Sequence, residues 1–328
     1  MIEWSEQHIM IQDMVRRFVE AEIVPHLEQI EHGDLPPYDI MRKLVSTLGV
    51  AEAARMRYAA MKQRALEPAT PGDTRPPKPE GGLSSGDAVA MQLIPIIELS
   101  KYCPGMVTAM GVSMGLTAGA IMARGTWAQK DRWALPLLTL EKIGAWAITE
   151  PQSGSDAFGQ MKATARRDGD EYVLNGQKTF ITNGPYADTI VFICKLDRGE
   201  TDARERQVVS FILDKGMDGL VQSKPLRKMG MHSSPTGELF LDNVRAGRDR
   251  LMGESEAAAG GREGAKATFG VERSGVVAMA YGMVERCIQL CTDYARTRVQ
   301  FGKPIGEFQL IQLKLAQMEV ARINIRNL

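Results

Sequence analysis

The spacing of hydrophobic residues changes twice along this chain, and this limits the fold more than any other feature. Before about residue 140, apolar residues recur at helical intervals, as at Ile11, Val15 and Phe18. From Gly144 the chain breaks into short strand-like runs, and helical spacing returns after a Gly/Ala/Glu-rich stretch at 253–264. Helices followed by strands and again by helices predict an α+β protein whose strands form a sheet of their own.

We therefore expect three domains. They are an N-terminal all-α domain over residues 1–140, a middle β-domain over 141–252 and a helical bundle over 253–328. The last predicted helix starts near Glu307 and still continues at Leu328 without a capping or stop signal. The bundle is therefore expected to be incomplete, with part of the domain missing beyond the last residue.

Within the N-terminal domain, one helix is expected to start near residue 5 and another to run from Tyr38 to about Leu66. A third is expected from Asp87 past Ile121. The intervening stretch, 67–87, contains five prolines and four glycines, so we predict a loop there.

The middle domain is predicted to hold several short strands. They cover residues 145–149, 161–167, 171–174, 178–182, 189–195, 208–213 and 238–241. Asp168-Gly169, Asn175-Gly176 and Asn183-Gly184 lie between or beside them and are expected to form hairpin turns, because these dipeptides accept positive φ. Tight turns with no helix between strands favour an antiparallel sheet or barrel.

Charge and targeting signals argue against several classes of partner. Forty basic residues balance forty acidic ones, so no overall field attracts nucleic acid or an anionic membrane. The N-terminus does not resemble a signal peptide, and no stretch has the unbroken apolar length of a membrane span. We expect a cytoplasmic protein.

Cysteine and histidine usage gives no sign of a metal site. The four histidines are scattered, and no Cys/His cluster has the spacing of metal ligands. Cys103, Cys194, Cys287 and Cys291 form no CxxC pair, and we interpret them as reduced core residues.

Two segments of the β-domain carry the residues best suited to chemistry. The first, 146–156, reads WAITEPQSGSD and offers hydroxyls and free backbone N–H groups where a strand enters a turn. The second, 178–184, places Phe180 and Thr182 two apart on a strand, so that a flat ring and a hydroxyl share one face and suit a flavin. Taken singly, each could instead be structural, as a turn and as a packed cross-strand pair.

Together these segments resemble the acyl-CoA dehydrogenase family, whose β-domain carries T-E-P-x-x-G-S-D and, downstream, N-G-x-K-x-[WF]-I-T-N-G. The resemblance continues through Met229-Gly230, Glu272-Arg273 and the stretch RVQFGKPI at 298–305, so it covers nearly the whole chain. It implies an α+β flavoprotein that binds FAD and removes hydrogen from an acyl-CoA thioester. The implied electron acceptor is an electron-transfer flavoprotein.

The resemblance also implies roles for residues that bind FAD. Ile148 and Thr149 would hydrogen-bond the isoalloxazine, Phe180 would stack on it, and Thr182 would lie near N5. Trp146 and Ile181 belong to the same two segments, and Ser155 would lie where the FAD phosphate and the acyl-CoA approach each other. A second set would reach the FAD of a neighbouring subunit, which implies a homo-oligomer built as a dimer of dimers: Arg298, Gln300, Phe301 and Gln309.

The general base implied by the resemblance is a glutamate. Isovaleryl- and long-chain-type relatives place it immediately before the arginine that matches Arg273, and Glu272 occupies that position here. Most relatives supply the base from a C-terminal segment that these 328 residues do not contain, so both sources remain open. Glu272 is expected at the start of a helix, where it could also be a dipole-compensating acid. Arg273 would support the substrate or the base.

Two departures from the family pattern fall outside these segments. His232 replaces an arginine common in the Met-Gly-x-Arg-x-Ser stretch, and Arg245-Ala246 replaces a usual proline. Two other functions remain open: a non-catalytic partner subunit, and an acyl-CoA oxidase or flavin monooxygenase that lets oxygen reach the reduced flavin.

Overall fold

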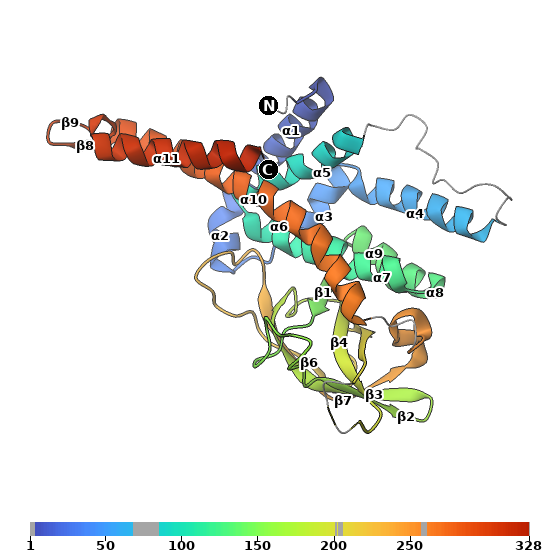
Figure 1. Cartoon of the computed structure of the whole chain (residues 1–328). Coiled ribbons are helices and arrows are strands. Elements are labelled where there is room, and N and C mark those ends of the chain that lie inside the picture. Colours follow the sequence, from blue (N-terminus) through green and yellow to red (C-terminus); the bar gives the residue numbers. More distant parts are fainter. Residues whose placement is uncertain (1–3, 68–84, 201, 203–205, 257–260, 328) are drawn as a thin grey trace. The chain divides into compact units, whose positions relative to one another are not determined.

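A computed structural model describes residues 4–67, 85–200, 202, 206–256 and 261–327 (Figure 1), although the side chains of 85–88 and 261–274 are not included. The predicted loop at 67–87 lies mostly outside these residues. The chain divides into two compact units, which we call the helical unit (Met1–Gln29, Thr74–Val107 and Arg273–Leu328) and the sheet unit (Ile30–Asp73 and Thr108–Glu272). Each unit therefore draws on distant parts of the sequence.

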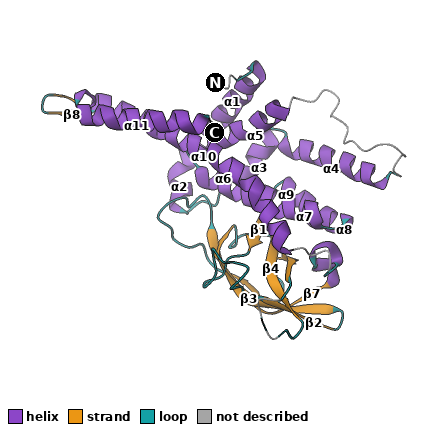
Figure 2. Ribbon diagram, in the orientation of Figure 1, coloured by secondary structure: helices purple, strands orange, loops and turns teal. Residues whose placement is uncertain are grey.

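The sheet unit is built around one seven-stranded sheet with the order β1-β4-β2-β3-β7-β6, in which β5 also pairs with β4 (Figure 2). The strands are β1 (Gly144–Ala147), β2 (Thr164–Asp168), β3 (Glu171–Thr182), β4 (Thr189–Asp197), β5 (Val208–Asp214), β6 (Leu220–Gln222) and β7 (Thr236–Gly247). The predicted α+β class is confirmed. The sheet is mixed, however, because β4 runs parallel to both β1 and β2.

The three predicted turns have different outcomes. Asp168-Gly169 does join β2 to β3 as a hairpin. The prediction for Asn175-Gly176 is wrong, because this dipeptide lies inside β3 at a bulge. A Cβ on Gly176 would lie 2.7 Å from the Cβ of Ala163, which explains the glycine. Asn183-Gly184 ends β3 without forming a hairpin, since β4 pairs with other strands.

Helices of the sheet unit cover β1 and β4, and β4 is buried over almost its full length. Their bounds are α3 (Tyr38–Thr47), α4 (Val50–Leu66), the π-helix η3 (Gly111–Thr117), α7 (Ala118–Arg124), α8 (Trp127–Gln129), the π-helix η4 (Lys130–Ala134) and α9 (Leu135–Leu138). The predicted helix from Tyr38 to Leu66 is thus divided at Gly49, whose φ of 65° breaks the helical path. The backbone of η3 lies so close to β1 that a Cβ on Gly144 would be 2.8 Å from Thr117.

The helical segment Pro104–Arg124 is long and apolar enough to cross a membrane, by length and composition alone. The sequence had suggested that no such stretch exists. Half of the segment is buried inside the protein, and the hydroxyl of Ser113 accepts a hydrogen bond from the Gly144 amide at 2.9 Å. Burial against a polar strand edge is typical of a core helix.

The helical unit contains α1 (Glu6–Phe18), the helical turns η1 (Val19–Ile23) and η2 (Val24–His26), α5 (Ser85–Ser100) and α11 (Gln309–Arg326). Helices α2 (Leu27–His32), α6 (Pro104–Met110) and α10 (Gly261–Thr297) pass from one unit into the other. A short hairpin of β8 (Val299–Gln300) and β9 (Lys303–Pro304) follows α10. The prediction of four core cysteines is wrong for Cys287 and Cys291, which are exposed.

Within the helical unit, α10 crosses α5 at very short range. A Cβ built on Gly282 would lie 2.2 Å from the carbonyl oxygen of Ile97, which is backbone and cannot move aside cheaply. Nearby, Lys101 donates to the buried carboxylate of Glu98 at 2.8 Å and forms an ion pair with Glu285 at 3.0 Å. The close crossing therefore requires glycine at position 282, and the ion pair between Lys101 and Glu285 links the two helices beside it.

We expect Gly282→Ala to lower the stability of the folded chain by about 1–3 kcal/mol, because the new methyl group overlaps the α5 backbone. Thermal unfolding followed by circular dichroism would measure the effect. Gly275→Ala, one helical stretch earlier on α10, is the matched control: its Cβ would meet only the Ile96 side chain at an ordinary 3.8 Å. Equal unfolding midpoints for the two variants would contradict the close crossing.

Candidate functional site

The two segments singled out in the sequence meet at one end of the sheet unit. The first continues from β1 through Ile148, Thr149 and Glu150 into a turn, and the second is the last part of β3. The amide of Thr179 donates a hydrogen bond of 2.9 Å to the carbonyl of Thr149. The sequence placed both segments in the β-domain, and this hydrogen bond places them side by side.

A buried lysine fixes the first segment to the second. Lys178, on β3, is fully buried, and its Nζ donates to the carbonyl of Ile148 at 2.9 Å and to Oε1 of Glu150 at 2.9 Å. The carboxylate of Glu150 also accepts from the amides of Lys162 at 2.7 Å and Ala163 at 3.0 Å. Burial lowers the pKa of Lys178, whereas the adjacent Glu150 carboxylate acts in the opposite direction.

We had not selected Lys178 or Glu150 as functional residues. Both stand inside the motifs quoted above, as the Glu of T-E-P and the Lys of N-G-x-K, which is the signal that could have identified them. Phe192 lies below the ammonium group, with its ring centroid 5.3 Å away, so Lys178 has an apolar neighbour as well as its two oxygens. A buried ammonium group beside an apolar ring is stable only if it is hydrogen-bonded, here to the Ile148 carbonyl and the Glu150 carboxylate.

The second segment leaves β3 with an unusual backbone. A bulge between Lys178 and Ile181 interrupts the pairing of β3 with β7, and Phe180 has a φ of 57°. Positive φ is rare for a bulky residue, and such outliers occur where the surrounding structure imposes them. The Phe180 side chain is 68% exposed, whereas Ile181 beside it is buried and Thr182 is half-buried.

Asn183 holds the end of this segment in place. Its amide nitrogen donates to the carbonyls of Ala109 and Gly144, both at 2.9 Å, and its side-chain oxygen accepts from the hydroxyl of Tyr38 at 3.1 Å. The residue is fully buried with a φ of 63°. Asparagine is one of the few residues that accept this conformation and can also satisfy three buried groups.

The residues present fit a flavin. Phe180 presents an exposed ring on a rigid backbone, and Thr182 follows two positions later. On β1, Trp146 is buried, and its Nε1–H has no hydrogen-bond partner within the described part of the chain. A buried donor without a partner costs about 1–3 kcal/mol, which a ligand acceptor would offset. Ser155 lies exposed on the loop that follows.

The residues expected to reach a neighbouring subunit gather on the β8–β9 hairpin and the start of α11, in the helical unit. All of them are exposed: Arg298, Gln300, Phe301 and Gln309. Phe301 is 92% exposed and has a φ of 52°, so a second aromatic ring is held outward by unusual backbone geometry.

Glu272 and Arg273 have side chains outside the described residues. Their backbone belongs to α10, which begins at Gly261, so the expectation that Glu272 starts a helix is wrong. Of the two departures from the family pattern, Arg245 has a structural role, because it forms ion pairs with Asp168 at 3.0 Å and Glu171 at 2.8 Å. It thereby links β7 to the β2–β3 hairpin.

Comparison with known families gives three matches in sequence order. The acyl-CoA dehydrogenase N-terminal domain matches residues 5–54, the middle domain matches 145–244 and the C-terminal domain matches 259–328. The middle-domain match contains every contact described above between the two segments.

Individual relatives agree with these matches. A 3-(aryl)acrylate reductase of Clostridium sporogenes is 32% identical over 96% of this chain and 76% of its own length. The solved structure of butyryl-CoA dehydrogenase from Megasphaera elsdenii covers 100% of this chain and 78% of its own, at a TM-score of 0.78 and 30% identity. Another chain, solved in work on the electron transferring flavoprotein of Acidaminococcus fermentans, has a TM-score of 0.77 and 29% identity over 100% of this chain and 79% of that chain.

The three domain matches and relatives covered over more than two thirds of their length lead to one conclusion. This chain belongs to the acyl-CoA dehydrogenase family of FAD-dependent oxidoreductases.

Proposed function

We propose that this chain catalyses α,β-dehydrogenation of an acyl-CoA thioester to the trans-2-enoyl-CoA. The observation that carries the proposal is the joining of the two motif segments by Lys178, which brings the Ile148–Glu150 backbone and the Phe180–Thr182 strand end to one place. When bound, FAD supplies the acceptor for the hydride that leaves the β-carbon.

In this proposal, the chain provides a preformed seat for the flavin. The backbone at Ile148 and Thr149 hydrogen-bonds the ring edge, and Trp146, with its unpaired Nε1–H, lies on the strand that leads into this backbone. Phe180 would stack on the ring, Ile181 belongs to the same strand end, and Thr182 would hold its hydroxyl near N5. Ser155 lies near the phosphates of FAD and of the thioester. Preorganised donors of this kind cost no reorganisation when charge develops.

Proton removal from the α-carbon is assigned to Glu272, with Arg273 beside it to support the substrate or the base. A carboxylate that is buried next to an apolar acyl chain acquires a raised pKa, which suits a general base near neutral pH. A glutamate from outside these 328 residues is the competing source.

Two kinds of protein partner belong to the proposal. One is a second copy of this chain, whose FAD would be reached by Arg298, Gln300, Phe301 and Gln309, as in a dimer of dimers; the exposure of all four is compatible with this. The other is an electron-transfer flavoprotein, which would reoxidise the flavin; the similar chain solved in work on such a flavoprotein supports this pairing. The cytoplasmic location remains a prediction from sequence.

A second candidate is the same chemistry in the opposite direction, reduction of an α,β-unsaturated acid derivative. The 3-(aryl)acrylate reductase with 32% identity favours it. The two directions use the same seat for the flavin and the same carboxylate, and they differ in which electron partner is available. An anaerobic titration separates them.

Anaerobic addition of acyl-CoAs of different chain length is expected to bleach the flavin absorption of the purified protein, because hydride transfer reduces the ring. Glu272→Gln should abolish bleaching while FAD stays bound, and Glu254→Gln is a control on a neighbouring segment. Bleaching that survives in Glu272→Gln would assign the base elsewhere. Flavin that is bleached only by dithionite and then reoxidised by an aryl-acrylate would support the reductase, and rapid reoxidation by oxygen would support an oxidase.

Lys178→Met is expected to lower stability by about 3–5 kcal/mol, because it leaves the buried Glu150 carboxylate without its cation. It should also weaken FAD binding and shift the flavin midpoint potential, since the Ile148 carbonyl loses its donor. Chemical denaturation, FAD titration and potentiometry measure the three effects.

The double variant Lys178→Met/Glu150→Gln separates positioning from stability. Removing both charges should recover part of the lost stability, but not the FAD affinity or the potential, because the Ile148 carbonyl still lacks its donor. If both flavin properties returned with stability, Lys178 would have no separate role in positioning the backbone.

A further inference from the structure

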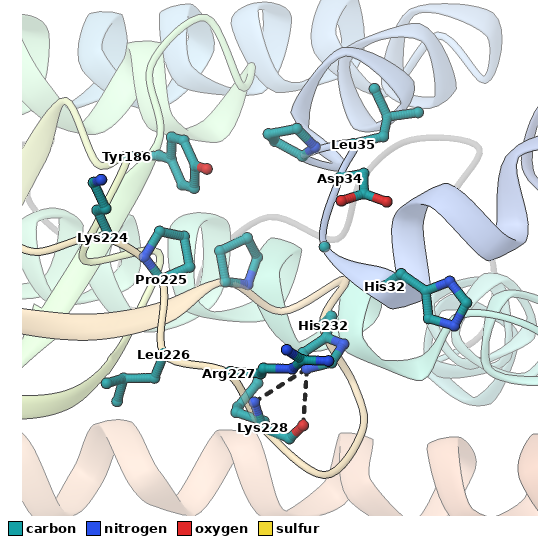
Figure 3. Close-up of a pocket in the computed structure, with 13 residues that line it drawn as sticks. His32, Asp34, Leu35, Tyr186, Lys224, Pro225, Leu226, Arg227, Lys228 and His232 are labelled. Atoms are coloured by element: carbon teal, nitrogen blue, oxygen red, sulfur yellow. Dashed lines mark hydrogen bonds between the residues drawn. The ribbon is translucent and has the colours of Figure 1, made fainter.

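A cavity of about 730 Å³ opens in the sheet unit, and its lining residues lie outside the two motif segments. One wall is the turn that follows α2, at residues 32–36, and the other is the loop 224–235 between β6 and β7 (Figure 3). Tyr186 stands at one end of the hollow in this view. None of the lining residues is among those assigned above to FAD, to the thioester or to a neighbouring subunit.

The cavity is rich in positive charge, although the whole chain has none in excess. Lys224, Arg227 and Lys228 line it, against a single lining carboxylate, Asp34. Within the described ranges, Lys224 and Arg227 form no ion pair or side-chain hydrogen bond. Two cations left without partners around one hollow raise its potential and favour an anion.

Lys228 has a different role, because its hydrogen bonds hold the loop 224–235 in its conformation. Its Nζ donates to the carbonyl of Ser234 and to the hydroxyl of Thr236, at 3.0 Å for the latter. Burial accordingly lowers its pKa, while Glu31, behind the wall, acts in the opposite direction. Glu31 itself accepts a hydrogen bond from the hydroxyl of Ser233. Lys228 and Glu31 therefore both make hydrogen bonds that stabilise the loop 224–235.

His232 also stabilises this loop, through contacts with Lys228 and with Glu31 of α2. Its Nε2 lies 3.1 Å from the amide nitrogen and 2.9 Å from the carbonyl oxygen of Lys228, and its Nδ1 is in hydrogen-bond contact with the carbonyl of Glu31 (Figure 3 shows the contacts with Lys228). Met231 has a φ of 54°, so the loop backbone is constrained there as well. His232, which departs from the family pattern, thus ties the loop to the last turn of α2, and the cavity is formed before any ligand arrives.

Besides His32 and Tyr186, the remaining lining side chains are apolar. Leu35, Pro36, Pro225, Leu226 and Pro235 provide surfaces without hydrogen-bonding side chains. The hydroxyl of Tyr186 has no hydrogen-bond partner among the described residues, although its ring packs against that of Tyr38. A ligand that fills this space needs a ring or short chain for the apolar wall and an anionic group for the two free cations.

We propose that this cavity binds an organic phosphate, at a site separate from those for FAD and the acyl-CoA. Phosphate suits the pair of free cations better than a carboxylate, because it carries up to two charges, and the planar guanidinium of Arg227 can bind two of its oxygens at once. The volume is in the range that encloses a ligand the size of a nucleotide. The site also borders the flavin segment, since the carbonyl of Pro235 accepts from the amide of Asn183 at 2.7 Å, one residue after Thr182.

The test uses the full chain saturated with FAD and titrates ADP by isothermal calorimetry. Arg227→Gln and Lys224→Gln should each weaken ADP binding by about tenfold or more, in line with the loss of a charged hydrogen bond. Arg166→Gln is the matched control: this arginine is exposed on β2 and has no ion pair in the described part of the chain. It should leave ADP affinity unchanged.

ADP bound at another nucleotide site would be insensitive to Arg227 and Lys224, so a loss confined to these variants locates the ligand. Unchanged affinity in both variants would overturn the proposal. Inorganic phosphate that binds as tightly as ADP would overturn the assignment of the apolar wall to a ring. Flavin bleaching by acyl-CoA is recorded separately, so failure of this site and failure of the proposed dehydrogenase reaction remain distinguishable.

Discussion

The contact between Lys178 and the Ile148–Glu150 backbone is the interaction on which the rest of the site depends. A fully buried ammonium group is tolerated only if its hydrogen bonds are satisfied, and the two acceptors it finds belong to a different segment of the chain. Glu150 in turn holds the amides that lead into β2. One charged pair therefore connects β1, β2 and β3 beside the residues that we propose to bind flavin. Burying a charged pair carries a desolvation penalty, so a packed apolar pair at the same positions could give comparable stability. The charged pair adds a fixed orientation of the polar backbone groups that it binds.

The sequence predicted the order of helices and strands and placed the two motif segments in the β-domain, because both predictions depend on local spacing and on motifs. It misassigned Asn175-Gly176, because a dipeptide that accepts positive φ serves equally in a turn or in a bulge inside a strand. It also misjudged Cys287 and Cys291: an apolar stripe shows which face of a helix is apolar but not whether another element covers that face. The parallel pairing of β4 with β1 and β2 depends on contacts between distant segments and has no local signal.

Residues with unexpected surroundings were the hardest to predict. Lysine is almost never fully buried without a partner, and nothing in the sequence around Lys178 identifies that partner. His232 and Arg245 were visible only as departures from a pattern, and the structure gives each a bonding role: His232 links the loop 224–235 to α2, and Arg245 links two parts of the sheet. In all three cases the chemistry of the side chain was readable, whereas its partner lay far away along the chain.

The backbone geometry of Phe180 has a consequence for the chain before it meets its cofactor. Holding a bulky residue at positive φ costs of order 1–3 kcal/mol, and folding rather than ligand binding supplies this energy. The ring therefore stands outward whether or not the site is filled, as a largely exposed aromatic surface. An incoming flavin would therefore meet an aromatic face whose orientation is already fixed, and its binding free energy would not be reduced by the cost of ordering this ring.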